Sequence, residues 1–136
     1  MKRILVVEDN EINRALIRDI LNLRDFEIIE AEDGQEGIDL ARRHKPDLIL
    51  MDIQLPVMDG ISATRILKGG PETRDIPMIA LTSYAYEKDR RSFLEAGGDG
   101  FISKPIDVDE LLRTIETVLS EKDESDGKRT QDPDSG

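Results

Sequence analysis

The sequence predicts an α/β protein with a doubly wound, five-stranded parallel sheet in the strand order 2-1-3-4-5. Short apolar runs alternate with helical patterns along the chain, and each run spans four to six residues rich in Ile, Leu or Val. Such runs are typical of strands that are buried beneath helices on both faces. Strands joined by helical crossovers must be parallel, and right-handed crossovers place helices on both sides of the sheet.

Five strand–helix units, written (βα)5, account for the chain up to about residue 120. Asn10 can cap the first helix, and Asp107 with Glu110 resembles a capping box that opens the fifth. Glycine pairs follow the third and fourth helices, as expected at helix ends. The expected strands are ILVV (4–7), FEIIEA (26–31), DLILM (47–51), PMIALT (77–82) and GFIS (100–103). The expected helices begin after residue 10 and then cover 34–45, 60–68, 86–96 and 107–120.

The composition indicates one cytoplasmic domain. With 136 residues the chain has the size of a single domain, and no apolar run is long enough to cross a bilayer. The first seven residues, MKRILVV, are too short for a signal peptide. The absence of cysteine excludes a disulfide framework, a thiolate metal site and a cysteine nucleophile.

The charge of the chain points to proteins or cations as partners. The formal net charge is −11, and −3 of it lies in residues 121–136, which leaves −8 on the rest. A negative field of this size disfavours binding to nucleic acid or to an anionic membrane. Residues 121–136 contain no apolar side chain to bury. We therefore expect one domain over residues 1–120, followed by an acidic, disordered tail over 121–136.

Polar side chains follow four of the five expected strands. Glu8 and Asp9 end the first strand, Asp52 the third, Thr82 the fourth and Lys104 the fifth. In a doubly wound sheet the functional crevice lies beyond the carboxyl ends of the strands, where the strand order reverses. One such residue alone would indicate a turn or a helix cap. Four strands that direct polar residues to one edge indicate a functional site.

Three carboxylates at one edge repel each other unless a cation neutralises them. Mg²⁺ prefers oxygen ligands and keeps several waters, so it suits this set, with Mn²⁺ as an alternative ion. We expect Asp9 and Asp52 to bind the ion directly, with a backbone carbonyl just after Asp52, and Glu8 to act through water. The ion, the Lys104 ammonium and the Thr82 hydroxyl would then surround a phosphoryl group. Asp52 is the expected nucleophile, which forms an acyl phosphate.

Four stretches resemble the receiver domain of two-component response regulators: ILVVEDN, PDLILMDIQLPVMDG, IALTSYA and GFISKPID. The resemblance covers residues 2–120 and implies the flavodoxin-like receiver fold. It implies that Asp52 accepts a phosphoryl group from a histidine kinase or a histidine phosphotransfer protein. The domain would then act as a switch that docks onto a downstream protein, and it would not be an enzyme in the usual sense.

The resemblance also implies roles for residues around the acceptor. Glu8, Asp9 and the Gln54 backbone carbonyl would serve Mg²⁺, together with Asp52. Lys104 would contact the phosphoryl group, and the peptide bond between Lys104 and Pro105 would be cis, an isomer that is far more accessible before proline than elsewhere.

The switch implied by the resemblance involves Thr82 and Phe101. Thr82 would move to bond a phosphoryl oxygen, and Phe101 would turn inward as it moves. Many relatives carry tyrosine at the Phe101 position, so in this chain packing alone would carry the signal. Gln54 and Tyr84 would flank the path of the water that removes the phosphate.

Individual residues argue against other functions of this fold. A phosphatase of the haloacid dehalogenase type would need an acid two residues after the nucleophile, where this chain has Gln54. A flavin mononucleotide carrier would need a phosphate cradle after the first strand, where EDNE would repel the phosphate. A pseudo-receiver would lack part of the set that is present here. Met1 lies close to the first strand, which favours a stand-alone regulator over a receiver module excised from a hybrid histidine kinase.

Overall fold

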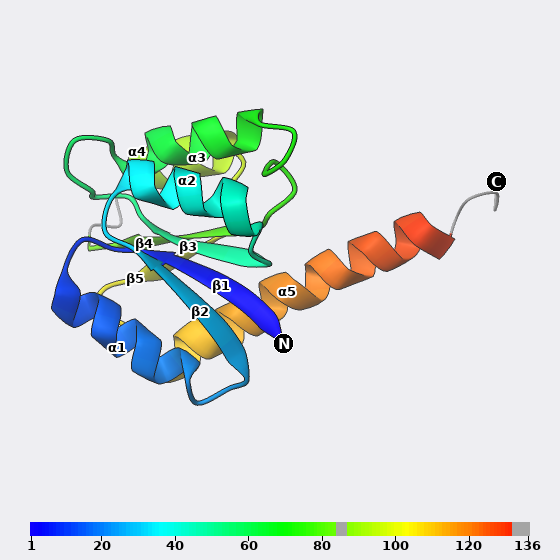
Figure 1. The fold of residues 1–136 in the computed structure, drawn as a ribbon, viewed down its shortest axis with the longest axis horizontal. Coiled ribbons are helices and arrows are strands. Elements are labelled where there is room, and N and C mark those ends of the chain that lie inside the picture. Colours follow the sequence, from blue (N-terminus) through cyan, green and yellow to red (C-terminus); the bar gives the residue numbers. More distant parts are fainter. Residues whose placement is uncertain (84–86, 132–136) are drawn as a thin grey trace.

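The computed structural model describes residues 1–83 and 87–131, with side chains as far as residue 124. It confirms the predicted fold class, because five parallel strands form one sheet in the order β2-β1-β3-β4-β5 (Figure 1). The elements are β1 (Lys2–Val7), α1 (Glu11–Leu21), β2 (Phe26–Ala31), α2 (Gly34–His44), β3 (Leu48–Asp52), α3 (Gly60–Gly69), β4 (Met78–Thr82), α4 (Glu87–Glu95), β5 (Gly100–Ser103) and α5 (Val108–Gln131).

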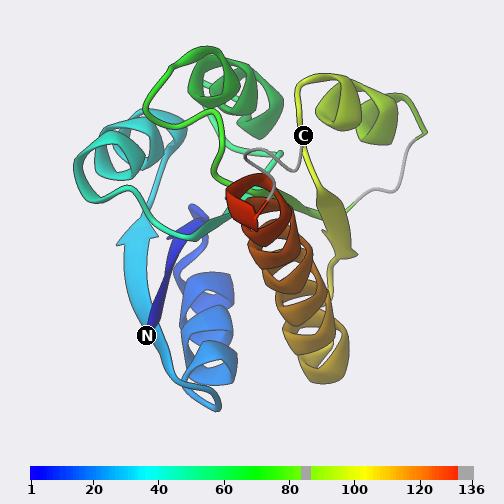
Figure 2. The same ribbon diagram turned by 90° about the vertical axis from the view of Figure 1, so that its right-hand side faces the viewer.

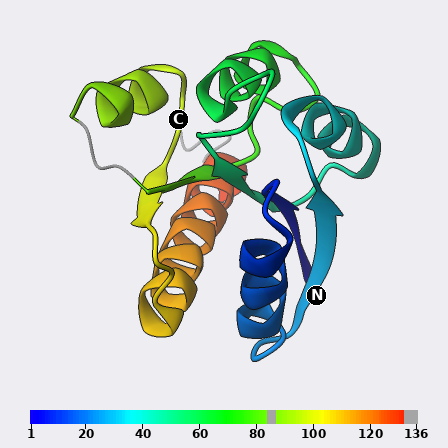
Figure 3. The ribbon, with the colours of Figure 1, turned by 90° about the vertical axis from the view of Figure 1, so that its left-hand side faces the viewer.

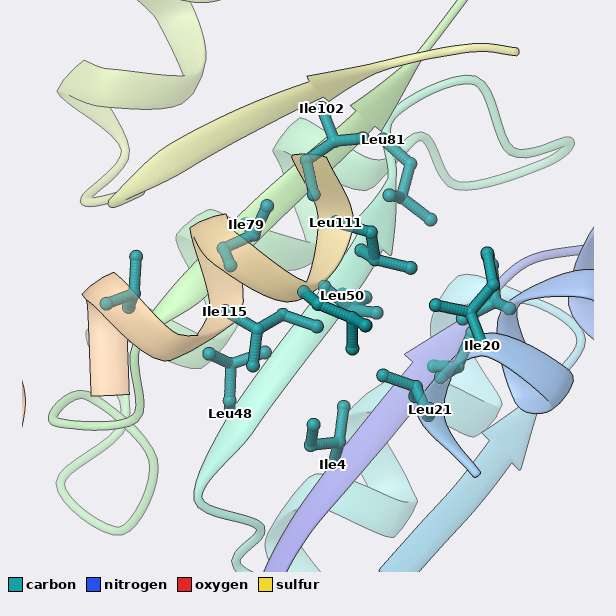
Figure 4. Packing of buried hydrophobic residues seen from close by; sticks show 14 of the residues in the cluster. Ile4, Ile20, Leu21, Leu48, Leu50, Ile79, Leu81, Ile102, Leu111 and Ile115 are labelled. Carbon is teal, nitrogen blue, oxygen red and sulfur yellow. The ribbon is translucent and has the colours of Figure 1, made fainter. Parts of the chain in front are cut away.

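The helices form a layer on each face of the sheet. Helices α1 and α5 cover one face, and α2, α3 and α4 cover the other (Figures 2 and 3). Alternate strand residues point to opposite faces. Ile4 and Val6 of β1 therefore join the core beneath α1 and α5, whereas Leu5 and Val7 join the core beneath α2, α3 and α4. Figure 4 shows Leu111 of α5 in the first of these cores.

The strand register brings the carboxyl ends together at one edge. In the parallel pairing, Val7 lies opposite Met51, Asp52 opposite Leu81, and Thr82 opposite Ser103. Strands β3 and β4 are buried along their whole length. The residues just beyond these strands are therefore presented from a rigid frame, which is what a preorganised site requires.

Side chains at the helix starts match the capping chemistry expected of polar residues. The Asn10 side chain accepts a hydrogen bond from the backbone N–H of Asn13 at 2.9 Å, as predicted. Asp33 and Asp59 cap α2 and α3 in the same way. Asp107 accepts from the backbone N–H of Glu110 at 2.9 Å.

Helix α5 is longer than the sequence predicts. The sequence predicts an end at about residue 120, whereas the helix continues to Gln131. Residues 121–131 contain no proline and are rich in Glu, Lys and Arg, which sustain helical hydrogen bonds without an apolar face. The last turns extend away from the sheet in Figure 1. The domain boundary at residue 120 stays a prediction. Within the described parts of the chain, no helix is both long and apolar enough to span a membrane.

Candidate functional site

The structure brings together the acidic residues that the sequence singled out. Carboxylate oxygens of Glu8, Asp9 and Asp52 all lie within 4.8 Å of one another. Glu8 and Asp9 follow β1, and Asp52 ends β3, its hydrogen-bonded neighbour in the sheet. Lys104, just beyond β5, reaches the same point with its ammonium group. Three separate strands therefore supply one compact charged cluster.

Lys104 bridges the two buried carboxylates of this cluster. Its Nζ lies 2.7 Å from Glu8 Oε1 and 2.9 Å from Asp52 Oδ2. The side chains of Glu8 and Asp52 are each only 1% exposed, whereas Asp9 is exposed. The cluster thus has a buried floor and an open side at Asp9. A ligand approaching from solvent would meet Asp9 first and Asp52 beneath it.

The Asp52 carboxylate is held at both oxygens. Oδ1 accepts a hydrogen bond from the backbone N–H of Gln54 at 2.8 Å, and Oδ2 accepts one from Lys104. The first bond comes from the loop between β3 and α3, and the second comes from beyond β5. Together they fix the orientation of the carboxylate, and preorganisation of this kind favours transfer chemistry.

The charges of this cluster do not balance. Burial raises the pKa of Glu8 to about 7, an effect that Lys104 opposes and Asp52 reinforces. Burial also lowers the pKa of Lys104, but its hydrogen bonds to Glu8 and Asp52 and their negative charges outweigh burial and raise that pKa overall. One ammonium group contacts two buried carboxylates, and the exposed Asp9 adds a third carboxylate nearby. The excess negative charge and the all-oxygen donor set fit a hard divalent cation such as Mg²⁺.

The remaining predicted residues lie around this cluster. Thr82 is buried at the end of β4, where it pairs with Ser103 in the sheet. The peptide bond between Lys104 and Pro105 is cis, which is the isomer that the resemblance implied. Tyr84 lies outside the described residues.

Phe101 is half-buried, and its ring contacts two residues of α4. The Phe93 ring meets it edge-on with centroids 5.2 Å apart, and the Arg90 guanidinium lies 4.8 Å from its centroid. Phe93 itself is fully buried. The Phe101 ring therefore connects β5 to α4 by packing and by a cation–π contact.

Sequence reasoning missed Arg14, a buried cation of α1 that supports the acidic cluster. Its guanidinium donates to the backbone carbonyl of Glu8 at 2.8 Å and to the Glu30 carboxylate at 3.2 Å. Arg18 binds the same Glu30 carboxylate with two bonds, at 2.7 and 2.8 Å. The sequence signal that could have indicated this role is the position of Arg14 in α1, five residues after Asp9 and on the buried face of the helix.

Two features of the loop between β3 and α3 were also missed. Val57 has a φ of 66° and a fully exposed side chain, in a turn where the Met58 N–H donates to the Pro56 carbonyl at 2.7 Å. A β-branched residue rarely adopts this conformation, so no sequence signal indicates it. At Gly60, an added Cβ would lie 2.2 Å from the Asp52 carbonyl oxygen. The start of α3 therefore approaches the backbone of Asp52 closely.

Comparisons with known proteins agree with the fold. Residues 4–116 match the family model described as the response regulator receiver domain. The chain is 44% identical over 120 residues to the polar-differentiation response regulator DivK of Brucella anthropi, covering 88% of this chain and 98% of that protein.

Solved structures with this fold include receiver domains of similar length. One is the receiver domain of sensor histidine kinase PA1611 from Pseudomonas aeruginosa, which has a TM-score of 0.81 and 37% identity and covers 88% of this chain and 98% of that one. That structure is described with a magnesium ion coordinated in its active site cleft. A CheY-like receiver domain protein from Methanospirillum hungatei has a TM-score of 0.86 and 29% identity, covering 92% and 98%. The chain belongs to the response regulator receiver domain family.

Proposed function

We propose that this protein is the phosphoacceptor of a two-component or phosphorelay pathway, with Asp52 as the residue that is phosphorylated in the presence of Mg²⁺. One observation carries the proposal above all. The Asp52 carboxylate is buried at a strand end, 2.9 Å from the Lys104 ammonium, with oxygens of Glu8 and Asp9 within 4.8 Å of its own. A purely structural aspartate gains nothing from two further carboxylates at that distance, because they repel it.

Mg²⁺ would be held by Asp9, Asp52 and the backbone carbonyl of Gln54, with Glu8 acting through water, and Mn²⁺ could replace it. When bound, the ion neutralises the carboxylates and the phosphoryl oxygens. The clustered carboxylate oxygens support this assignment. The related receiver domain of the sensor histidine kinase PA1611 is described with magnesium in its active site cleft, which supports it further.

The protein's own groups account for the transfer from a phosphohistidine. An Asp52 carboxylate oxygen forms a bond to phosphorus while the bond between phosphorus and the imidazole nitrogen of the donor breaks. The electron pair of the broken bond stays on that nitrogen, which needs no acid from this protein to leave. The absence of an acid two residues after Asp52, where this chain has Gln54 and a phosphatase would need a carboxylic acid, is consistent with such a leaving group. Lys104 stabilises the negative oxygens of the group in transfer.

Phosphorylation would act on protein partners through Thr82 and Phe101. The acyl phosphate adds about −1.5 to −2 charges at neutral pH, which attracts donors such as the Thr82 hydroxyl. Phe101 then changes its packing against α4, so that the surface of α4, β5 and α5 differs between the two states. The partners are a histidine kinase or a histidine phosphotransfer protein as donor and a downstream protein as target, in the cytoplasm. The acidic net charge argues against nucleic acid and membrane partners.

The intact mass of the protein after incubation with acetyl phosphate and Mg²⁺ tests this function. We expect the mass of one added phosphoryl group, absent when EDTA removes the metal and absent in Asp52→Asn. Asp59→Asn is the matched control, because Asp59 is an exposed helix cap whose role asparagine can keep. It should be labelled like the wild type. Undiminished labelling of Asp52→Asn would contradict the proposal.

A further inference from the structure

The side chain of Gln54 connects the loop after β3 to Ser83, the first residue after β4. Its Oε1 accepts a hydrogen bond from the backbone N–H of Ser83 at 2.9 Å. Its own backbone N–H donates to Asp52 Oδ1 at 2.8 Å. One residue thus contacts the acceptor carboxylate with its main chain and the residue after Thr82 with its side chain.

The bond to Ser83 lies where the sheet ladder ends. The Leu81 carbonyl accepts from the N–H of Ile53 at 3.1 Å, and the Thr82 carbonyl accepts from the N–H of Lys104 at 2.8 Å. These backbone bonds hold β4 between its two neighbours. Ser83 is the first residue beyond them, and its N–H takes a side-chain acceptor. The position of the chain just after Thr82 therefore depends on a hydrogen bond to the side chain of an exposed glutamine.

We propose that Gln54 is a latch: a positioning residue that holds Ser83, the first residue after β4, in its unphosphorylated position and thereby opposes the switch. This proposal rests on the proposed function, since it assumes that Asp52 is phosphorylated. Movement of Thr82 toward a phosphoryl group carries the Ser83 N–H with it, away from the position where Gln54 Oε1 accepts it. A phosphoryl group on Asp52 also disturbs the carboxylate that receives the Gln54 N–H. Both events weaken the same residue's contacts, so the latch opens when the acceptor is occupied.

The opposite role is a static brace. In that case the bond between Gln54 and Ser83 would keep the crevice in the shape that phosphorylation requires, and its loss would weaken the modified state. The two roles predict opposite signs for the same substitution. Gln54→Met removes the acceptor at nearly constant side-chain length and leaves the backbone N–H and carbonyl of residue 54 in place.

The test measures the affinity of the Mg²⁺-loaded protein for beryllofluoride, which mimics an acyl phosphate on Asp52. We expect Gln54→Met to bind it about fivefold more tightly than the wild type, because one ordinary hydrogen bond no longer favours the unmodified state. Gln35→Met is the control, since Gln35 is an exposed glutamine of α2 whose side chain bonds only Asp39 among the described residues. It should bind like the wild type.

The amide signal of Ser83 provides a readout that a general loss of stability would not produce. In the unmodified protein, Gln54→Met should shift the Ser83 amide resonance and accelerate its hydrogen exchange, whereas Gln54→Glu keeps an acceptor oxygen and should restore both. Unchanged or weaker beryllofluoride binding by Gln54→Met, with normal binding by the wild type, would overturn the latch. A wild type that neither binds beryllofluoride nor gains a phosphoryl group would overturn the proposed function and the latch together.

Discussion

Two lysines at opposite ends of the sheet are almost equally enclosed, yet their pKa values shift in opposite directions. The Lys104 side chain is 13% exposed and the Lys68 side chain 16%. The pKa of Lys104 is raised, because two carboxylates outweigh the effect of burial. The pKa of Lys68 is lowered, chiefly by burial, although Asp99 opposes that shift.

The difference lies in the partners of the two ammonium groups. Lys68 donates to the backbone carbonyls of Ile76 and Arg74 at 2.7 and 3.2 Å, and its nearest carboxylate, Asp99, is 3.8 Å away. It therefore ties the end of α3 to the segment before β4. Lys104 instead faces more negative charge than it can neutralise. Similar enclosure thus accompanies opposite pKa shifts, and the charge of the partners decides the direction of each shift.

The charges that line a cavity at the Lys68 end extend the same comparison. A cavity of about 540 Å³ lies at the Lys68 end, away from the acidic cluster. Its lining carries three cationic and three acidic side chains, which balance: Lys68, Arg74, Lys122, Asp75, Asp99 and Glu121. The acidic cluster around Asp52 is the unbalanced one, and an excess of carboxylates is the charge pattern expected of a site that binds a cation.

The largest effect that we expect is a difference in unfolding free energy between substitutions at the two ends of helix α3. Gly60 begins α3 at the end near Asp52, where a Cβ would lie 2.2 Å from the Asp52 carbonyl oxygen, and Gly69 ends it, with nothing within 4 Å of a Cβ. Gly60→Ala should cost about 3 kcal/mol of unfolding free energy and reduce labelling of Asp52 by acetyl phosphate. Gly69→Ala should be neutral or stabilise by up to about 1 kcal/mol. Urea denaturation measures both, and equal effects would mean that the close approach at Gly60 is wrong.

A smaller effect concerns the charge excess at Asp52. Asp52→Asn removes one buried charge and leaves Glu8 paired with Lys104 at 2.7 Å. In EDTA this substitution should therefore raise the unfolding free energy by about 1–2 kcal/mol. Added Mg²⁺ should stabilise the wild type more than Asp52→Asn, so that the difference shrinks. A loss of stability for Asp52→Asn in EDTA would show that the cluster is balanced without a metal.

The smallest effect concerns Glu30, a carboxylate with a surplus of cations. The hydrogen bond from Arg18 is the largest cause that lowers the pKa of Glu30 below its ordinary value of 4.5. A lowered pKa means that the stabilisation is present above pH 4.5 and is lost as the pH falls through the lower value. Glu30→Gln should therefore cause a small loss of stability at neutral pH that disappears in acid. A loss that is equal at all pH values would exclude the ion pair as its cause.

Local patterns in the sequence predicted most of the fold. The apolar run Leu48–Met51 favoured a buried strand, and the alternation of such runs with helices indicated a parallel sheet. Asn10 marked the start of α1 because its side chain bonds within its own turn. The end of α5 was predicted too early, since missing apolar residues show the absence of burial and do not forbid helical hydrogen bonds.

The site could be predicted at the level of strand ends, and its supporting contacts could not. Asp52 and Lys104 follow their strands directly, so the sheet alone brings them together. The bond from Ser83 to Gln54 spans 29 positions of the chain, and the contact of Arg90 with Phe101 joins a helix to a strand. Such pairs depend on side-chain orientations between elements, which no short pattern contains.

The most direct test of this account compares the phosphorylation rate of Lys104→Met and Lys68→Met, per folded molecule, with acetyl phosphate and saturating Mg²⁺. We expect Lys104→Met to lower the rate at least about tenfold, because it removes the cation that stabilises the transferred group. Lys68→Met should keep the wild-type rate while it lowers the unfolding free energy by about 1–2 kcal/mol through lost hydrogen bonds to backbone carbonyls. A wild-type rate for Lys104→Met, or an equal loss of rate in both variants, would contradict the assignment of the acceptor site to the Lys104 end of the sheet.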